Sequence, residues 1–218
     1  MAFNLEEQEK ISAIKAWWDK WSNLITIAVV LVVVAFFAHT GWKWYQAQHA
    51  ENALAYYDEI VNASGDISEE NTARIKVSID KLRESYSSTA YASRAIMIAS
   101  DYFYKANRLD LAKDNLSWLI AQTSEFPEFT DIARLRLSTI QIEQGEYEAA
   151  QNNLNAIKDE KAQAMVKDKL ADLAFAQGEV QKAVDMWRSI IQDEHLTLSP
   201  GFRNYIVFKI STLGKSKE

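Results

Sequence analysis

QGEYEAA (residues 144–150) recurs further along the chain as QGEVQKA (residues 177–183). An apolar helical pattern precedes each copy and another follows it. The Gly permits the left-handed backbone with which many helices end, and the Ala that closes each copy is small enough for the second helix to pack closely on the first. A weaker third copy, ANRLDLA at 106–112, has Asn107 in the Gly position. The sequence therefore predicts a helix–turn–helix unit that repeats along the chain.

The spacing of the two strong copies resembles that of the tetratricopeptide repeat, a helical pair with a period of about 34 residues. In this register, large apolar residues fall at equivalent places in the three second helices, namely Leu116, Leu154 and Trp187, then Leu119, Ile157 and Ile190 one turn later. We expect repeats at about 93–126, 131–163 and 164–197. They are degenerate, because the Trp and Gly of the first-helix consensus are missing. A non-repetitive helical bundle is the alternative.

The spacing of the turns is uneven. The turns at Asn107 and Gly145 lie further apart in sequence than those at Gly145 and Gly178, and EFPE (125–128) falls within the longer interval. This predicts irregular stacking between the first two repeats.

One repeat alone cannot bury its apolar face, so further helices must cap the stack. We expect a helical hairpin at 47–86 before the repeats and a closing helix near 202–213 after them. The hairpin ends at SST (87–89), whose hydroxyls suit the start of the next helix. Six Gly and two Pro in 218 residues also argue against a turn-dense β-sandwich, a collagen-like repeat or low-complexity disorder.

A second feature lies nearer the N-terminus, where the stretch between Lys20 and Lys43 carries no formal charge. As a helix this stretch spans about 33 Å, enough to cross a hydrocarbon core of about 30 Å. Five of the chain's seven Trp flank it, as expected for rings at headgroup depth. We therefore predict a transmembrane helix in a lipid bilayer, with six membrane-interface residues: Trp17, Trp18, Trp21, Trp42, Trp44 and Tyr45.

Two alternatives exist for this segment, a cleaved signal peptide and a core helix of a soluble domain. A cleavage site needs small residues three and one before it, and Phe36 before Ala38 or Tyr45 before Ala47 does not fit. Basic residues near the ends set the orientation, and three Lys precede the span while only Lys43 closely follows it. We expect a single-pass protein of the bacterial inner membrane with a cytoplasmic N-terminus and a periplasmic C-terminal domain.

The predicted fold class is all-α, an N-terminal transmembrane helix followed by a tetratricopeptide-like α-solenoid. The expected segments are a cytoplasmic leader at 1–20, the transmembrane helix with its aromatic belts at 21–45, a helical hairpin at 46–90, three degenerate repeats at 91–198, and a capping helix with a tail at 199–218.

Catalytic chemistry is not indicated by the sequence. Without Cys there is no thiol catalysis, Cys-ligated metal or disulfide. No Gly-rich phosphate loop, dinucleotide fingerprint or nucleophile elbow occurs. The three His are scattered, and the acid pairs Asp159-Glu160 and Glu69-Glu70 lie near predicted helix starts. A net charge of −6 argues against a sequence-independent nucleic-acid binder. We predict no enzyme activity, no catalytic residue, no metal, no cofactor and no nucleic-acid partner.

The first helix of each repeat lines the concave face of a solenoid, where partner polypeptides bind. The register assigns to this face Arg94, Met97, Asp101, Tyr104 and Lys105 of the first repeat, Ile132, Leu135, Thr139 and Ile142 of the second, and Met165, Asp168, Asp172 and Phe175 of the third. This mixture suits extended or helical apolar segments. A basic clamp for a C-terminal carboxylate is not evident. Many of these apolar residues could instead be core beneath the closing helix.

AIKxWW (13–18), GWKWY (41–45) and GExxKAxxxW (178–187) together resemble the YfgM family of bacterial ancillary subunits of the SecYEG translocon. This resemblance implies an inner-membrane protein whose periplasmic repeats associate with the translocon and with the membrane-anchored chaperone PpiD. Its clients are then secreted or envelope proteins that emerge from the channel. The family supplies no catalytic residues, and we expect divergence after Thr197.

Two functions remain open at this point. In the first, the protein is a translocon-associated chaperone or holding factor, and its anchor raises the concentration of the repeats near the channel. In the second, it is a structural scaffold that assembles envelope complexes for secretion, division or stress signalling without binding clients.

Overall fold

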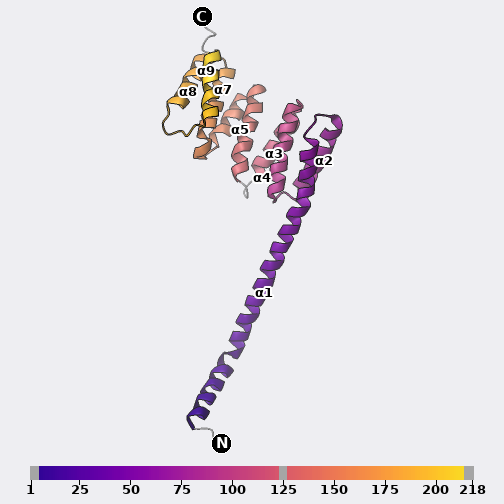
Figure 1. Ribbon diagram of the computed structural model, residues 1–218, viewed down its shortest axis with the longest axis vertical. Coiled ribbons are helices and arrows are strands. Elements are labelled where there is room, and N and C mark those ends of the chain that lie inside the picture. The colour runs from indigo at the N-terminus through magenta and orange to yellow at the C-terminus, as the bar shows by residue number, and fades with distance from the viewer. Residues whose placement is uncertain (1–4, 123–126, 214–218) are drawn as a thin grey trace. The chain divides into compact units, whose positions relative to one another are not determined.

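The computed structural model describes residues 5–122 and 127–213, and its regular elements in these ranges are all helices (Figure 1). The chain divides into two units, Met1–Glu51 and Asn52–Glu218. Helix α1 (Leu5–Ala63) contributes to both units. Glu125 and Phe126, which were expected to disturb the stacking, lie outside the described residues.

The first unit consists of the N-terminal part of α1, which is long and apolar enough to cross a membrane. None of its most apolar 18-residue window is buried inside the protein. Large apolar side chains such as Val32, Phe36 and Phe37 are more than 60% exposed. A core helix of a soluble domain would bury these side chains, so the structure disagrees with that alternative.

The second unit is a stack of helical pairs. The end of α1 precedes α2 (Glu69–Ser85), and three pairs follow: α3 (Ala90–Lys105) with α4 (Leu109–Gln122), α5 (Pro127–Glu143) with α6 (Tyr147–Asn155), and α7 (Gln163–Ala176) with α8 (Val180–Gln192). A short 3₁₀ helix, η1 (Glu160–Ala162), leads into α7, and α9 (Pro200–Leu213) closes the stack. From α2 onward, successive helices contact one another in chain order, which confirms the predicted all-α solenoid (Figure 1).

The three turns within these pairs have the same geometry. Asn107, Gly145 and Gly178 have φ values of 57°, 76° and 83°, in the left-handed region. At each turn this residue donates its N–H to the carbonyl three residues earlier, and the next residue donates to the carbonyl five residues before itself. This is the Schellman arrangement, which satisfies the last carbonyls of a helix. The predicted equivalence of Asn107 with the two Gly residues is confirmed.

The core follows the predicted register. Ala112, Ala150 and Ala183, the last residues of the three repeated phrases, are fully buried. The large residues that follow them are at most 3% exposed: Leu116, Leu119, Leu154, Ile157, Trp187 and Ile190. A small residue near the start of each second helix thus brings two backbones together, and the large residues below it fill the space between pairs.

Polar side chains begin several helices as expected. The Ser68 hydroxyl accepts a hydrogen bond from the N–H of Asn71 at the start of α2, and Thr89 accepts one from Ala92 at the start of α3. Glu69 and Glu70 lie in the first turn of α2. Asp159 caps η1 through the N–H of Lys161. The acid pairs Glu69-Glu70 and Asp159-Glu160 therefore lie at helix starts, where a carboxylate meets the positive end of the helix dipole.

Candidate partner-binding surface

The residues assigned to the concave face come from α3, α5 and α7, and their burial depends on their place in the register. The first member of each set is exposed: Arg94, Ile132 and Met165. The second is buried, at 7%, 9% and 3% exposure: Met97, Leu135 and Asp168. The third is partly buried: Asp101, Thr139 and Asp172. The fourth is Tyr104, Ile142 and Phe175, with Tyr104 and Phe175 over a third exposed.

The prediction is corrected at the second register position. Met97 packs in the core around α3, and Leu135 packs with Leu154, Ile157 and Val166. These side chains fill the contact between neighbouring helices, so a partner cannot reach them in this conformation. For Met97 and Leu135, the alternative interpretation is correct: these residues of the predicted face belong to the core.

A cleft of about 180 Å³ lies between α3 and α5. It brings together Asp101, Tyr104 and Thr139, three of the predicted residues. Ser100, Leu116, Arg136 and Ile140 complete its lining. Arg136 was not among the predicted residues. It lies four residues after Ile132 and three before Thr139, and residues at these spacings share a helix face.

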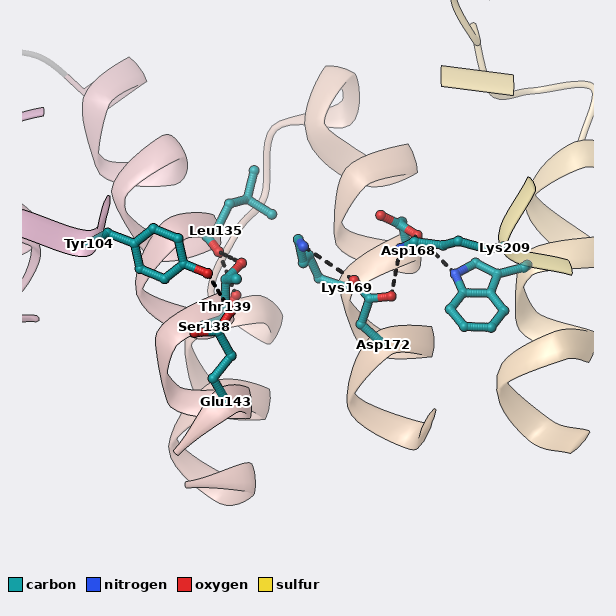
Figure 2. A network of polar contacts seen from close by, with 10 residues as sticks. Tyr104, Leu135, Ser138, Thr139, Glu143, Asp168, Lys169, Asp172 and Lys209 are labelled. Atoms are coloured by element: carbon teal, nitrogen blue, oxygen red, sulfur yellow. Dashed lines mark hydrogen bonds and ion pairs between the residues drawn. The ribbon is translucent and has the colours of Figure 1, made fainter. Parts of the chain in front are cut away.

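Polar contacts join α3 to α5 on either side of this cleft. Arg136 Nη1 donates a hydrogen bond to the Met97 carbonyl oxygen at 3.0 Å. The Tyr104 hydroxyl donates to Glu143 Oε1 at 2.5 Å, and Figure 2 shows these two side chains meeting. This hydrogen bond, together with partial burial, raises the pKa of Tyr104 to about 12. The phenol therefore keeps its proton on the shared hydrogen bond at pH 10, where an ordinary tyrosine is half ionised.

At α7 two of the corresponding register positions are contacted by a lysine side chain from α9. Lys209 Nζ lies 2.7 Å from Asp168 Oδ1 and 2.6 Å from Asp172 Oδ1 (Figure 2). Asp168 also accepts a hydrogen bond from Trp187 Nε1 at 2.9 Å, and Asp172 is paired with Lys169 at 3.2 Å. Asp168 is therefore buried because the chain's own closing helix supplies its counter-ion, and it does not face an open surface.

Burial raises the pKa of the Asp168 carboxyl, and the nearby Asp172 raises it further, against the opposing effect of Lys209. Burial lowers the pKa of the Lys209 ammonium, but its hydrogen bonds with Asp168 and Asp172 outweigh burial, and the net shift is upward. Lys209 also lies over the rings of Trp187 and Tyr205, at 5.2 Å and 4.5 Å from their centroids. The ammonium is thus held by charge and by aromatic faces together.

The six aromatic residues at the predicted membrane boundaries are 41–69% exposed. Trp42 contacts Tyr45, and Tyr45 stacks on His49 at a centroid distance of 5.7 Å, along one side of α1. Protein packing does not account for these side chains. Their placement at a membrane interface stays a prediction.

Within residues 5–122 and 127–213, no group of three or more His, Asp or Glu side chains is arranged to hold a metal ion. The carboxylates that come together, Asp168 and Asp172, are neutralised by Lys209. The described surface consists of a cleft between α3 and α5, exposed apolar side chains on the first helices and a few charges.

Across the described residues, these features define a class: helical-repeat proteins with an N-terminal helix long and apolar enough to span a membrane. The chain belongs to the tetratricopeptide repeat-like domain family, whose model matches residues 15–215. This match extends from the residues before the apolar segment to the closing helix.

Three relatives are similar over most of their length, and each is named ancillary SecYEG translocon subunit. The Haemophilus influenzae protein is 28% identical over 82% of this chain and 85% of its own. The Aggregatibacter actinomycetemcomitans protein is 26% identical over 84% and 87%. The Escherichia coli protein is 24% identical over 95% and 96%. The predicted resemblance to this group of proteins is confirmed.

Proposed function

We propose that the protein is a membrane-anchored accessory subunit of the SecYEG translocon that holds polypeptides as they emerge from the channel. The observation that carries the proposal is the similarity to translocon subunits along nearly the whole chain, apolar helix and repeats included. If the relatives were similar to this chain only in the repeats, the similarity would indicate a general binding domain and nothing about an anchor. Similarity across both units supports the combination of an anchor and a binding surface.

The proposed location is the bacterial inner membrane, with the N-terminus in the cytoplasm and the repeat domain in the periplasm. The three Lys before the apolar segment support this orientation. Tethering raises the local concentration of the repeat surface near the channel, so weak contacts with an emerging chain are sufficient. A PpiD-like periplasmic chaperone is the proposed second partner, to which a held client passes.

The surface also supports a binding role and not a catalytic one. Ile132 and Met165 are each more than 40% exposed on first helices, and Tyr104 and Phe175 are nearly as exposed. Such apolar and aromatic side chains adapt to segments of varied shape. The relatives are named as subunits of a translocon and not as enzymes.

The first experiment measures orientation, and it uses the absence of Cys from the chain. Single substitutions Ser12→Cys and Ser117→Cys place a thiol at an exposed position on either side of the apolar segment. A thiol reagent that cannot cross the inner membrane should label Cys at 117 in intact cells, and Cys at 12 only after the membrane is opened. The reverse labelling would contradict the proposed orientation.

The second experiment identifies partners by photo-crosslinking from single positions of the full-length protein. Probes at Trp44, Ile132 and Met165 should capture translocon subunits and a translocating chain arrested in the channel. A probe at Arg188, exposed on the second helix α8, is the matched control. Crosslinks only to folded envelope proteins would instead support the scaffold function, and crosslinks to neither class would contradict both.

A further inference from the structure

The cleft between α3 and α5 has a positive and a negative end. The two helices touch through Arg136 and the Met97 carbonyl, and again through Glu143 and Tyr104. On α5 these contacts are seven residues apart, about 10 Å along the helix. The residues that line the cleft, Asp101 and Thr139 among them, lie between the two contacts in sequence. A guanidinium therefore marks one end of a short trough, and a carboxylate marks the other.

The cleft is the size of one side chain. Its volume of about 180 Å³ is below the range of about 300–1,000 Å³ typical of pockets for small organic ligands. Two apolar residues of the lining, Leu116 and Ile140, are almost fully buried, at 1% and 2% exposure. Tyr104 and Thr139 supply accessible lining, and an apolar side chain of a partner would contact these two residues.

The charges at the cleft are unequal. Asp101 is paired with Lys105 at 2.6 Å, and Glu143 accepts the Tyr104 hydroxyl. Arg136 is exposed and donates to a carbonyl, and among the described residues it forms no ion pair with a carboxylate. Its remaining N–H groups are available to an acceptor, and the planar guanidinium matches a carboxylate in geometry.

We propose that this cleft binds a polypeptide segment that carries an apolar side chain next to a carboxylate. The apolar side chain packs on the accessible parts of Tyr104 and Thr139, and the carboxylate pairs with Arg136. A carboxylate at the opposite end would meet Glu143, so the segment binds in one direction. This inference rests on the proposed function, because it gives the chemistry of the segments that the translocon accessory surface holds.

The test measures binding of defined peptides to the full-length protein in detergent by fluorescence anisotropy. The probes are labelled peptides with an Ala–Ser host sequence that contains Leu-Asp or Phe-Asp. Matched sets contain Leu-Asn and Phe-Asn, which remove the charge, or Ser-Asp, which removes the apolar group. We expect the Leu-Asp and Phe-Asp peptides to bind about tenfold more tightly than either matched set, because a hydrogen bond to a charged group is lost or the apolar contact is lost.

Variants then separate binding from structural support. Arg136→Gln should remove the preference for Asp over Asn, whereas Arg136→Lys should retain part of it. Arg134→Gln is the matched control, since Arg134 lies on the same helix and donates to Asn153 of α6. Thr139→Phe should fill the cleft and weaken all peptides. Circular dichroism of each variant checks that the helices remain folded.

Equal affinity of wild-type protein for the Asp and Asn peptides would overturn the inference, as would an absence of peptide binding or an equal loss in Arg134→Gln. The proposed function is judged separately by the crosslinks from Trp44, Ile132 and Met165. If those crosslinks persist while the peptides show no preference, the cleft chemistry is wrong and the translocon role stands. If the crosslinks are absent while the preference is present, the translocon role is wrong.

Discussion

The α3–α5 cleft and the α7–α9 contact involve equivalent register positions of the repeats. The cleft is open, whereas in the α7–α9 contact a side chain of α9 fills the corresponding place. Asp101 and Asp172 occupy the same register position on their first helices. Asp101 pairs within its own helix with Lys105, whereas Asp172 pairs with Lys209 of α9. The comparison teaches that the counter-ion of this register position comes from the same helix in one region and from a distant helix in the other. At α7 the counter-ion is the cation Lys209, whereas at α3–α5 the cation Arg136 forms no ion pair among the described residues.

The strongest test of this comparison removes the cation from the α7–α9 contact. Lys209→Met should destabilise the repeat domain by about 3 kcal/mol, because Asp168 is left buried without its counter-ion. The measurement is denaturant unfolding of the full-length protein in detergent. Lys182→Met, which breaks an exposed pair within α8, is the control and should cost less than about 0.5 kcal/mol. The double variant Asp168→Asn with Lys209→Met keeps an acceptor for the Trp187 indole and should recover much of the loss, and failure to do so would argue against a charge-based attachment.

The second largest effect on stability is expected at the turns that follow α3 and α7. Gly178→Ala should cost about 1 kcal/mol, because a Cβ is disfavoured at its φ of 83° although no neighbouring atom crowds it. The equivalent turn after α3 already carries Asn107, so Asn107→Gly should leave stability unchanged or raise it. Thermal unfolding monitored by circular dichroism compares the two. Destabilisation by Asn107→Gly would show that the Asn107 side chain itself stabilises the fold, in addition to the left-handed conformation of its backbone.

The two Asp residues of the shared register position provide a matched pair. Asp172→Asn should cost about 1 kcal/mol, because hydrogen bonds to a partly buried ammonium are weakened. Asp101→Asn should cost about 0.3 kcal/mol, since its pair with Lys105 is exposed and lies within one helix. Unfolding of both variants under the same conditions gives the difference. Equal effects would mean that the two surfaces do not differ in the way described.

The smallest expected effect concerns the Tyr104 hydroxyl at the α3–α5 cleft. The pKa of Tyr104 is about 12 in the folded protein, above the ordinary value of 10.0, so its contact with Glu143 stabilises the fold below pH 10 and this stability is lost between pH 10 and 12. The difference in tyrosinate absorbance between wild type and Tyr104→Phe during an alkaline titration isolates this group. Glu143→Ala should return the pKa toward 10. A Tyr104 that titrates near 10 in the wild type would contradict the contact.

Much of the fold could be predicted because its signals are local. A left-handed residue after a helix and a small residue early in the next one are properties of a few neighbouring positions, as at Gly145 and Ala150. The exposed apolar segment between Lys20 and Lys43 is likewise recognisable from composition and flanking Trp. The boundaries of the predicted segments, by contrast, stay a prediction.

The candidate site was less predictable because a helical period does not say which neighbour covers a face. Met97 and Asp168 share a stripe with exposed residues, yet adjacent helices bury them. Lys209 lies 41 and 37 residues from its partners Asp168 and Asp172, and no local pattern links them. Arg136 was not predicted because the register on α5 takes positions 132, 135, 139 and 142, and position 136 lies beside this row on the same side of the helix.

The attachment of α9 has a consequence for how the domain opens. Among its described residues Ile206 alone is buried, while Tyr205, Val207 and Phe208 are 47–65% exposed. A helix held by one fully buried side chain, a few partly buried ones and one ammonium group undocks at lower cost than helices held by full cores. Its amides should therefore exchange with solvent before those of α7 and α8. Undocking of α9 would expose Trp187 and the carboxylates of Asp168 and Asp172. These groups would then be accessible to another molecule.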